Sequence, residues 1–231
     1  MTGVQTCALP ILALDSAEAF FEWLQRPGPS GAALGLLTRF LRGRGMHLLG
    51  TGTPHMLSFG VGCDPDRWGP PYDAHLRPGG FFDGDSGRIE ALDEGQVNEH
   101  VRHSWFRRYE GGRHPYDGET IPDYQPETDR YSWAKAPRYG RRVVQTGPVA
   151  ELLIGGDALI RDLHATEGAG AWLRQFARVR RVAWGLVHGR RMIDEMAARL
   201  NDPHFVPPAE GSERDRSEEH TSELQSHSFI S

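Results

Sequence analysis

The sequence predicts an α+β fold that is dominated by helices and rich in loops. Apolar residues recur at helical spacing near both ends of the chain, which indicates amphipathic helices there. Short apolar runs of strand character lie between them, and 14 of the 28 glycines and 10 of the 16 prolines fall from Thr51 through Pro148. Because glycine and proline interrupt regular elements, we expect a loop-rich middle that packs on other segments.

Two helices are expected first, over residues 16–25 and 31–43. The first opens on DSAE, which has the spacing of a capping box, and PGP ends it. Its apolar face is formed by two phenylalanines and Leu24. The second repeats leucine and phenylalanine at helical spacing, and Gly43 and Gly45 supply its stop.

Short strands and one further helix are expected next. Met56–Val61 (MLSFGV) has strand character, and Arg88–Glu90 is a candidate edge strand after a turn-rich loop. Asp93 and Gln96 have capping spacing, and two valines and a tryptophan follow at i, i+4 and i+8. This pattern predicts a helix over 94–105.

A hairpin and two helices complete the expected elements. Tyr131–Trp133 and Arg142–Gln145 are expected to pair within 131–145, around a proline and a glycine. A proline in the first turn favours a helix over 148–163. The longest helix is expected over 169–199, where a 3.6-residue apolar period alternates with arginines that we interpret as a solvated face.

The two ends of the chain read as translations of opposite strands of one DNA adapter used in short-read sequencing. RSEEHTSELQSH, which begins at Arg216, back-translates to this adapter, and the reverse complement translates to MTGVQTCALPI at the start of the chain. We therefore expect residues 1–11 and 216–231 to be foreign and poorly packed. Residues 12–215 are then expected to be an internal fragment of a longer protein.

Composition excludes several classes of function. The formal net charge is −5, and it becomes −3 without the tail, which carries one arginine and three glutamates. There is no basic stripe, so we expect no nucleic-acid partner. No apolar run reaches the roughly 20 residues of a membrane span, so none is expected in this chain. Cys63 is the only cysteine outside the two ends, and it is interpreted as a small buried apolar residue, with a catalytic nucleophile as the alternative.

A few side chains suggest site chemistry. His100 and His103 lie three apart on the expected helix, and with His114 they could offer three imidazoles to a metal. Surface histidines without a ligand are the alternative, because no carboxylate is placed to orient them. Asp117 and Glu119 could be paired carboxylates for acid–base chemistry, or simply turn-forming acids.

Four motifs follow one another along the middle of the chain: HSW from His103, HPYDGETIPDY from His114, DRYSWAKAPRY from Asp129 and GPVA from Gly147. This ordered series resembles the large subunit of nickel-iron hydrogenases, which shows HSW, HPY-like, YSW-x-KAPR and GPLA-like segments in the same order. The resemblance is clear over 99–153, looser over 46–87 and weak beyond residue 170. Gln145, Thr146 and Glu151 depart from the family pattern around GPVA.

The resemblance implies the middle portion of the large-subunit fold and, for the complete protein, reversible oxidation of H2 to protons and electrons. It implies a nickel-iron centre bridged by thiolates, with carbon monoxide and cyanide on the iron, and an iron-sulfur small subunit as the partner. The four thiolates of the family come from two CxxC motifs, one near each end of the full subunit. This sequence has neither motif. We therefore assign it no catalytic residue, no metal ligand and no cofactor of its own, and we expect it to be inactive alone.

Four residues of the resembling motifs are candidates for a supporting role: His114, Glu119, Lys135 and Arg138. Pro137 restricts the backbone between the two cations. In the complete subunit we expect these residues close to the metal site or at the small-subunit interface. A solvated surface hairpin is the alternative.

A second hypothesis of a different class is a metal-free domain that binds a protein partner on the same scaffold. It requires a native start near Leu12 and a native stop near Asp215. The hydrogenase hypothesis requires two CxxC motifs in the flanking sequence of a longer gene.

Overall fold

The fold was obtained as a computed structural model, which describes residues 11–26, 32–63 and 75–200. The chain divides into two compact units, Met1–Val187 and His188–Ser231, each described by itself. The expectations for residues 1–10 and 216–231 concern segments outside the described ranges. Ile11 is the last residue of the expected adapter segment 1–11 and the first residue that the structure describes. Its side chain is 3% exposed and belongs to the hydrophobic core.

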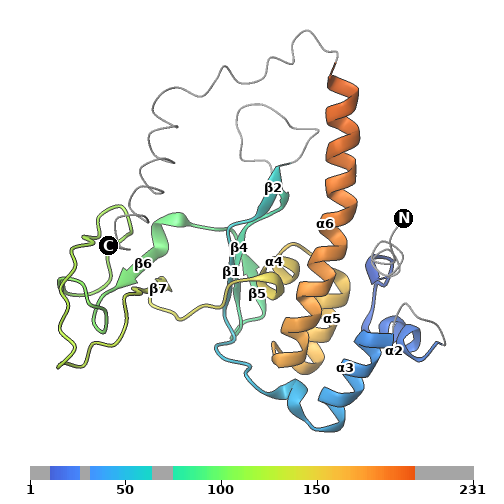
Figure 1. Cartoon of the computed structure of the whole chain (residues 1–231), viewed down its shortest axis with the longest axis horizontal. Coiled ribbons are helices and arrows are strands. Elements are labelled where there is room, and N and C mark those ends of the chain that lie inside the picture. The colour runs from blue at the N-terminus through green and yellow to red at the C-terminus, as the bar shows by residue number, and fades with distance from the viewer. Residues whose placement is uncertain (1–10, 27–31, 64–74, 201–231) are drawn as a thin grey trace, which may run out of the picture. The chain divides into compact units, whose positions relative to one another are not determined.

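Short antiparallel strands form three small sheets in the described part (Figure 1). The strands are β1 (Met56–Ser58), β2 (Val61–Cys63), β3 (His75–Arg77), β4 (Gly80–Asp83), β5 (Arg88–Glu90), β6 (Val97–His100) and β7 (Ala136–Tyr139). The largest sheet has the order β1-β4-β5, while β2 pairs with β3 and β6 with β7. The strand expected from Met56 and the edge strand expected at β5 are both confirmed.

The helices are α2 (Ala17–Gln25), α3 (Ala32–Gly43), α4 (Pro148–Ile154), α5 (Ala158–Glu167) and α6 (Ala171–Arg199), with 3-10 turns η2 (Met46–Leu48) and η4 (Glu94–Gln96). Ser16 caps α2 by accepting from the Ala19 amide, as its sequence predicts. Asp157 caps α5 by accepting from the Ile160 amide at 3.1 Å and also pairs with Arg180 at 2.8 Å. No helix of the described residues is long and apolar enough to cross a membrane.

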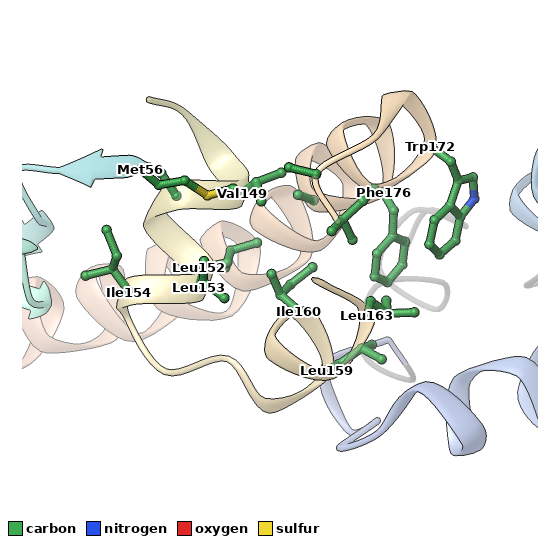
Figure 2. Packing of buried hydrophobic residues seen from close by; sticks show 14 of the residues in the cluster. Met56, Val149, Leu152, Leu153, Ile154, Leu159, Ile160, Leu163, Trp172 and Phe176 are labelled. Carbon is green, nitrogen blue, oxygen red and sulfur yellow. The ribbon is translucent and has the colours of Figure 1, made fainter. Parts of the chain in front are cut away.

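The core lies among α2, α4, α5 and the first half of α6 (Figure 2). Trp172 and Phe176 stack with their ring centroids 5.4 Å apart, and Phe20 of α2 lies 4.6 Å from the Phe176 ring. The Trp172 indole nitrogen donates to the Thr38 hydroxyl at 3.0 Å, which satisfies a fully buried polar group. A smaller cluster of Leu57, Phe81 and Tyr139 packs the β1-β4-β5 sheet against β7. The expected mixed, helix-rich fold is confirmed.

The helix expected over 94–105 is wrong. Asp93 caps only the single turn η4, accepting from the Gly95 amide at 3.0 Å. The chain then becomes β6, which pairs with β7 over four residues. Valine, asparagine and histidine have only weak helix propensity, so the ladder to β7 overrides the local capping signal.

The hairpin expected within 131–145 and the single helix over 148–163 are also wrong. β7 pairs with β6. Its contact with the segment that follows it is limited to one isolated antiparallel bridge between Tyr139 and Arg142. The helical segment is divided into α4 and α5 because Gly156 adopts a positive φ of 88°, a conformation that favours glycine. Asp157 then starts the new helix.

Candidate functional site

The strands β6 and β7 organise the motif-bearing loops and lie side by side in Figure 1. Their register pairs Val97 with Tyr139, Asn98 with Arg138, Glu99 with Pro137 and His100 with Ala136. Because successive side chains of a strand point to opposite faces, Asn98, His100 and Arg138 share one face. Glu99 lies on the other face, where it meets Lys135. Lys135 and Arg138, the two cations singled out from the sequence, therefore lie on opposite faces of this small sheet.

One face is built around the ion pair of Lys135 Nζ with Glu99 Oε1, whose side chains are 13% and 17% exposed. Lys135 also donates to the Thr120 hydroxyl at 2.8 Å. Gly118 approaches the Glu99 carboxylate so closely that a Cβ would overlap it. The Tyr109 hydroxyl donates to the Glu99 carbonyl at 3.3 Å, and burial, with the Glu99 charge, raises the pKa of Tyr109. Glu99 thus joins β6 to three loop segments.

The opposite face opens into a groove of about 1070 Å³. Its cationic lining residues are Arg102, Arg138 and Arg141. Arg102 and Arg141 are exposed, whereas Arg138 is half-buried and donates from Nη1 to the Pro137 carbonyl at 2.8 Å. Neutral and imidazole-bearing residues complete the lining: Gln96, Asn98, His100, His103, Ser104, Tyr131 and Ser132, with alanines and glycines. We call this feature the β6–β7 groove.

An aromatic layer connects the HSW and YSW motifs. The Trp105 ring centroid lies 5.3 Å from that of Trp133 and 5.1 Å from that of Tyr124, both in edge-on contact. The Ser104 hydroxyl donates to the Ala134 carbonyl at 2.6 Å. These contacts fix the two motifs beside one another, so the aromatic residues act in packing.

His114 and Glu119, the other two candidates, do not join Lys135 and Arg138. His114 stacks on Tyr116 and its Nδ1 lies 3.3 Å from the Tyr116 amide. Glu119 is exposed and has no hydrogen-bond or ion-pair partner among the described residues. The neighbouring Thr120 makes the contact with Lys135 instead.

The three histidines considered as metal ligands each have a different partner. His100 Nε2 lies 3.1 Å from Asn98 Oδ1. His103 Nδ1 lies 3.2 Å from the Asp129 carbonyl, and His114 contacts Tyr116. Asp117 donates its amide to the His114 carbonyl at 2.9 Å and is exposed, which is the geometry of a turn.

A group that sequence reasoning missed combines His55 with Asp83 and Asp85 of the β4–β5 turn. His55 Nδ1 lies 3.1 Å from Asp83 Oδ1, and Nε2 lies 3.7 Å from Asp85 Oδ2. A hydrogen bond from the Ser86 hydroxyl, then the Asp85 amide and the positive charge of Arg142, lower the pKa of Asp83. The DGDS sequence was the available signal. The Asp83 carboxylate already accepts hydrogen bonds within the turn, from the Asp85 amide and the Ser86 hydroxyl.

These donors do not fit a nickel-iron centre. Such a centre takes soft thiolates, whereas this group offers one imidazole and two hard carboxylates. The sequence has two cysteines in total, and neither belongs to a CxxC motif. Cys63 ends β2, and its side chain lies outside the described part of the structure.

Comparisons with known proteins identify the family. The sequence pattern of the nickel-dependent hydrogenases matches residues 43–177. The chain is similar to the hydrogenase-1 large chain of Escherichia coli (strain K12), with 39% identity over 106 residues that cover 36% of this chain and 18% of that one. It is also similar to the periplasmic NiFeSe hydrogenase large subunit of Desulfomicrobium baculatum, with 32% identity over 126 residues, or 51% of this chain and 23% of that one.

The fold agrees with that of a solved relative. The Ni-Fe-Se hydrogenase from D. vulgaris Hildenborough in its reduced state superposes with a TM-score of 0.59 at 21% sequence identity, which covers 78% of this chain and 41% of the solved chain. The chain thus spans well under half the length of the relatives that it matches. Since the family pattern covers more than half of the chain and contains β1 through the first turns of α6, the chain belongs to the nickel-dependent hydrogenase family, as a region of its large subunit.

Proposed function

We propose that this chain is an internal region of the catalytic large subunit of a nickel-iron hydrogenase that oxidises H2 reversibly to protons and electrons. The family match over residues 43–177 carries the proposal. The partial coverage of the relatives supports a region of a longer protein, because this chain matches only part of their length. The adapter-like sequences of residues 1–11 and 216–231 agree with the same origin.

The complete subunit would hold nickel and iron through cysteine thiolates, with carbon monoxide and cyanide on the iron. That centre would supply the heterolytic chemistry of H2. The present chain offers no pair of neighbouring thiolates, so by itself it should neither retain the centre nor turn over H2. Its own contribution is structural: Glu99 and Lys135 hold the motif-bearing loops together.

We further propose an iron-sulfur small subunit as the partner of the complete protein. The loop layer, which we define as β6, β7, the loops between them and the turn after β7 (residues 97–142), is the candidate for contact with it, because Tyr131 and Trp133 are 73% and 49% exposed there. Exposed aromatic residues are enriched at protein interfaces. Lys135 pairs with Glu99 inside this layer, and Arg138 lines the groove on the opposite face of the sheet.

Sequencing the gene from which this chain derives tests the proposal. The expected result is a longer reading frame that carries one CxxC motif upstream of residue 12 and a second downstream of residue 215. A native start near Leu12 and a native stop near Asp215, without either motif, would contradict it. That outcome would support the metal-free interaction domain.

A further inference from the structure

We propose that the β6–β7 groove binds an acidic segment of a partner protein, held by Arg102, Arg138 and Arg141. This inference deepens the proposed partner interaction, and it rests on the proposed function in one respect, that the chain works within a larger assembly. Three features carry it: the charge of the lining, the unused hydrogen-bonding capacity of its arginines, and the size of the groove.

The lining is cationic in a chain of opposite net charge. Three arginines and two histidines line the groove, and no aspartate or glutamate is found among its described lining residues. The whole chain has a formal net charge of −5. Asp129 lies at the His103 edge, 3.6 Å from the imidazole, and it is already paired with Arg108. The groove therefore concentrates positive charge that its own residues do not neutralise.

Four cations elsewhere in the loop layer form ion pairs, whereas the three arginines of the groove form none within the described part of the chain. Lys135 pairs with Glu99, Arg108 with Asp129, Arg130 with Asp123 and Arg142 with Asp83. Arg102 and Arg141 have no ion pair among the described residues, and Arg138 uses one donor on a backbone carbonyl. A guanidinium has five donors in a planar fork that matches carboxylates. Three arginines with free donors thus line the same groove.

The dimensions favour an extended segment over a small anion. The groove volume of about 1070 Å³ lies just above the roughly 300–1,000 Å³ typical of small-molecule pockets. Ser132 also lines it, and its hydroxyl can donate to a peptide backbone because within the chain it accepts from the Ala134 amide. Tyr131, 73% exposed at the rim, adds apolar contact area. A mixed lining of this kind suits carboxylate side chains on a polypeptide.

Fluorescence anisotropy of a labelled hexaglutamate peptide with the 231-residue chain tests the inference at low and moderate salt. The test variant is Arg102→Gln with Arg141→Gln, because both residues are exposed and unpaired, so folding is not at risk. Arg88→Gln with Arg107→Gln is the matched control, since these arginines are also exposed and lie outside the groove.

The expected result is salt-sensitive binding that weakens about tenfold in the test variant and stays within about twofold in the control. Adding Arg138→Gln should weaken it further. Equal binding by both variants, or no binding by the parent sequence, overturns the inference.

Two competition arms separate other anions. Complete displacement by low millimolar inorganic phosphate would indicate a simple anion site, and tighter binding of a single-stranded oligonucleotide of equal charge would indicate a nucleic-acid site. Either result overturns the acidic-peptide inference. All of these outcomes are independent of the gene sequence that tests the proposed function, so the two can fail separately.

Discussion

Replacing Lys135 by methionine should destabilise the loop layer by about 2–3 kcal/mol. Methionine keeps an unbranched side chain that is one atom shorter and removes the charge, which leaves Glu99 without its cation. Loss of one partner costs about 3–5 kcal/mol in a fully buried pair, whereas exposed pairs contribute about 0–1 kcal/mol. At 13% and 17% exposure the pair lies nearer the buried limit, and the Thr120 contact is lost as well.

Urea unfolding followed by tryptophan fluorescence measures this loss, because Trp105 and Trp133 lie in the same layer. Glu99→Gln in the Lys135→Met background should restore part of the stability, so that the double-mutant cycle gives a coupling of about 1–2 kcal/mol. Arg88→Met, at an exposed cation of β5, serves as the control and should change the free energy of unfolding by less than about 0.5 kcal/mol.

A chemical readout is also available, since Lys135 is the only lysine of the sequence. Its amine should react slowly with an acylating reagent in the native chain and faster after Glu99→Gln, with the modified peptide located by mass spectrometry. The reasoning is refuted if Lys135→Met matches the control variant and Lys135 reacts as fast as a free lysine.

Three further changes have defined outcomes. Thr38→Val leaves the buried Trp172 indole without its acceptor and should cost about 1–3 kcal/mol in urea unfolding; a variant as stable as the parent sequence would argue against that bond. Burial lowers the pKa of His164 below its ordinary 6.5, so the unfolded chain binds the proton more readily and stability should fall as pH drops below that value. His164→Gln should flatten this pH dependence. An unchanged slope would mean that another group causes the pH dependence of stability. In the complete subunit, Arg138→Ala should weaken small-subunit association or H2 oxidation; wild-type assembly and wild-type turnover would rule out its role.

The helices were predictable where the apolar period continues over several turns. α2, α3 and α6 follow their expected ranges because a stripe of buried residues and a capping or stop residue agree there. The division into α4 and α5 was also readable in principle, since two glycines precede the capping Asp157. The apolar residues on both sides of the two glycines favoured one continuous helix instead.

The site was harder to predict because its geometry depends on long-range pairing. Lys135 and Arg138 were singled out from their motif, but their partners follow from β6, which was expected to be helical. On a helix, Glu99 would not have alternated with Asn98 and His100 between two faces. The ion pair with Lys135 and the groove therefore both followed from a ladder that spans about forty residues of sequence, which no local pattern encodes.

The most direct test of the central claim measures nickel retention and H2 turnover by the purified 231-residue chain. A region of the large subunit without paired thiolates should bind nickel only as weakly as separate histidines allow, and it should neither evolve nor consume H2. Equimolar nickel that survives dialysis against a chelator and persists after His100→Ala with His103→Ala, or any H2 turnover above a metal-free control, would contradict the account.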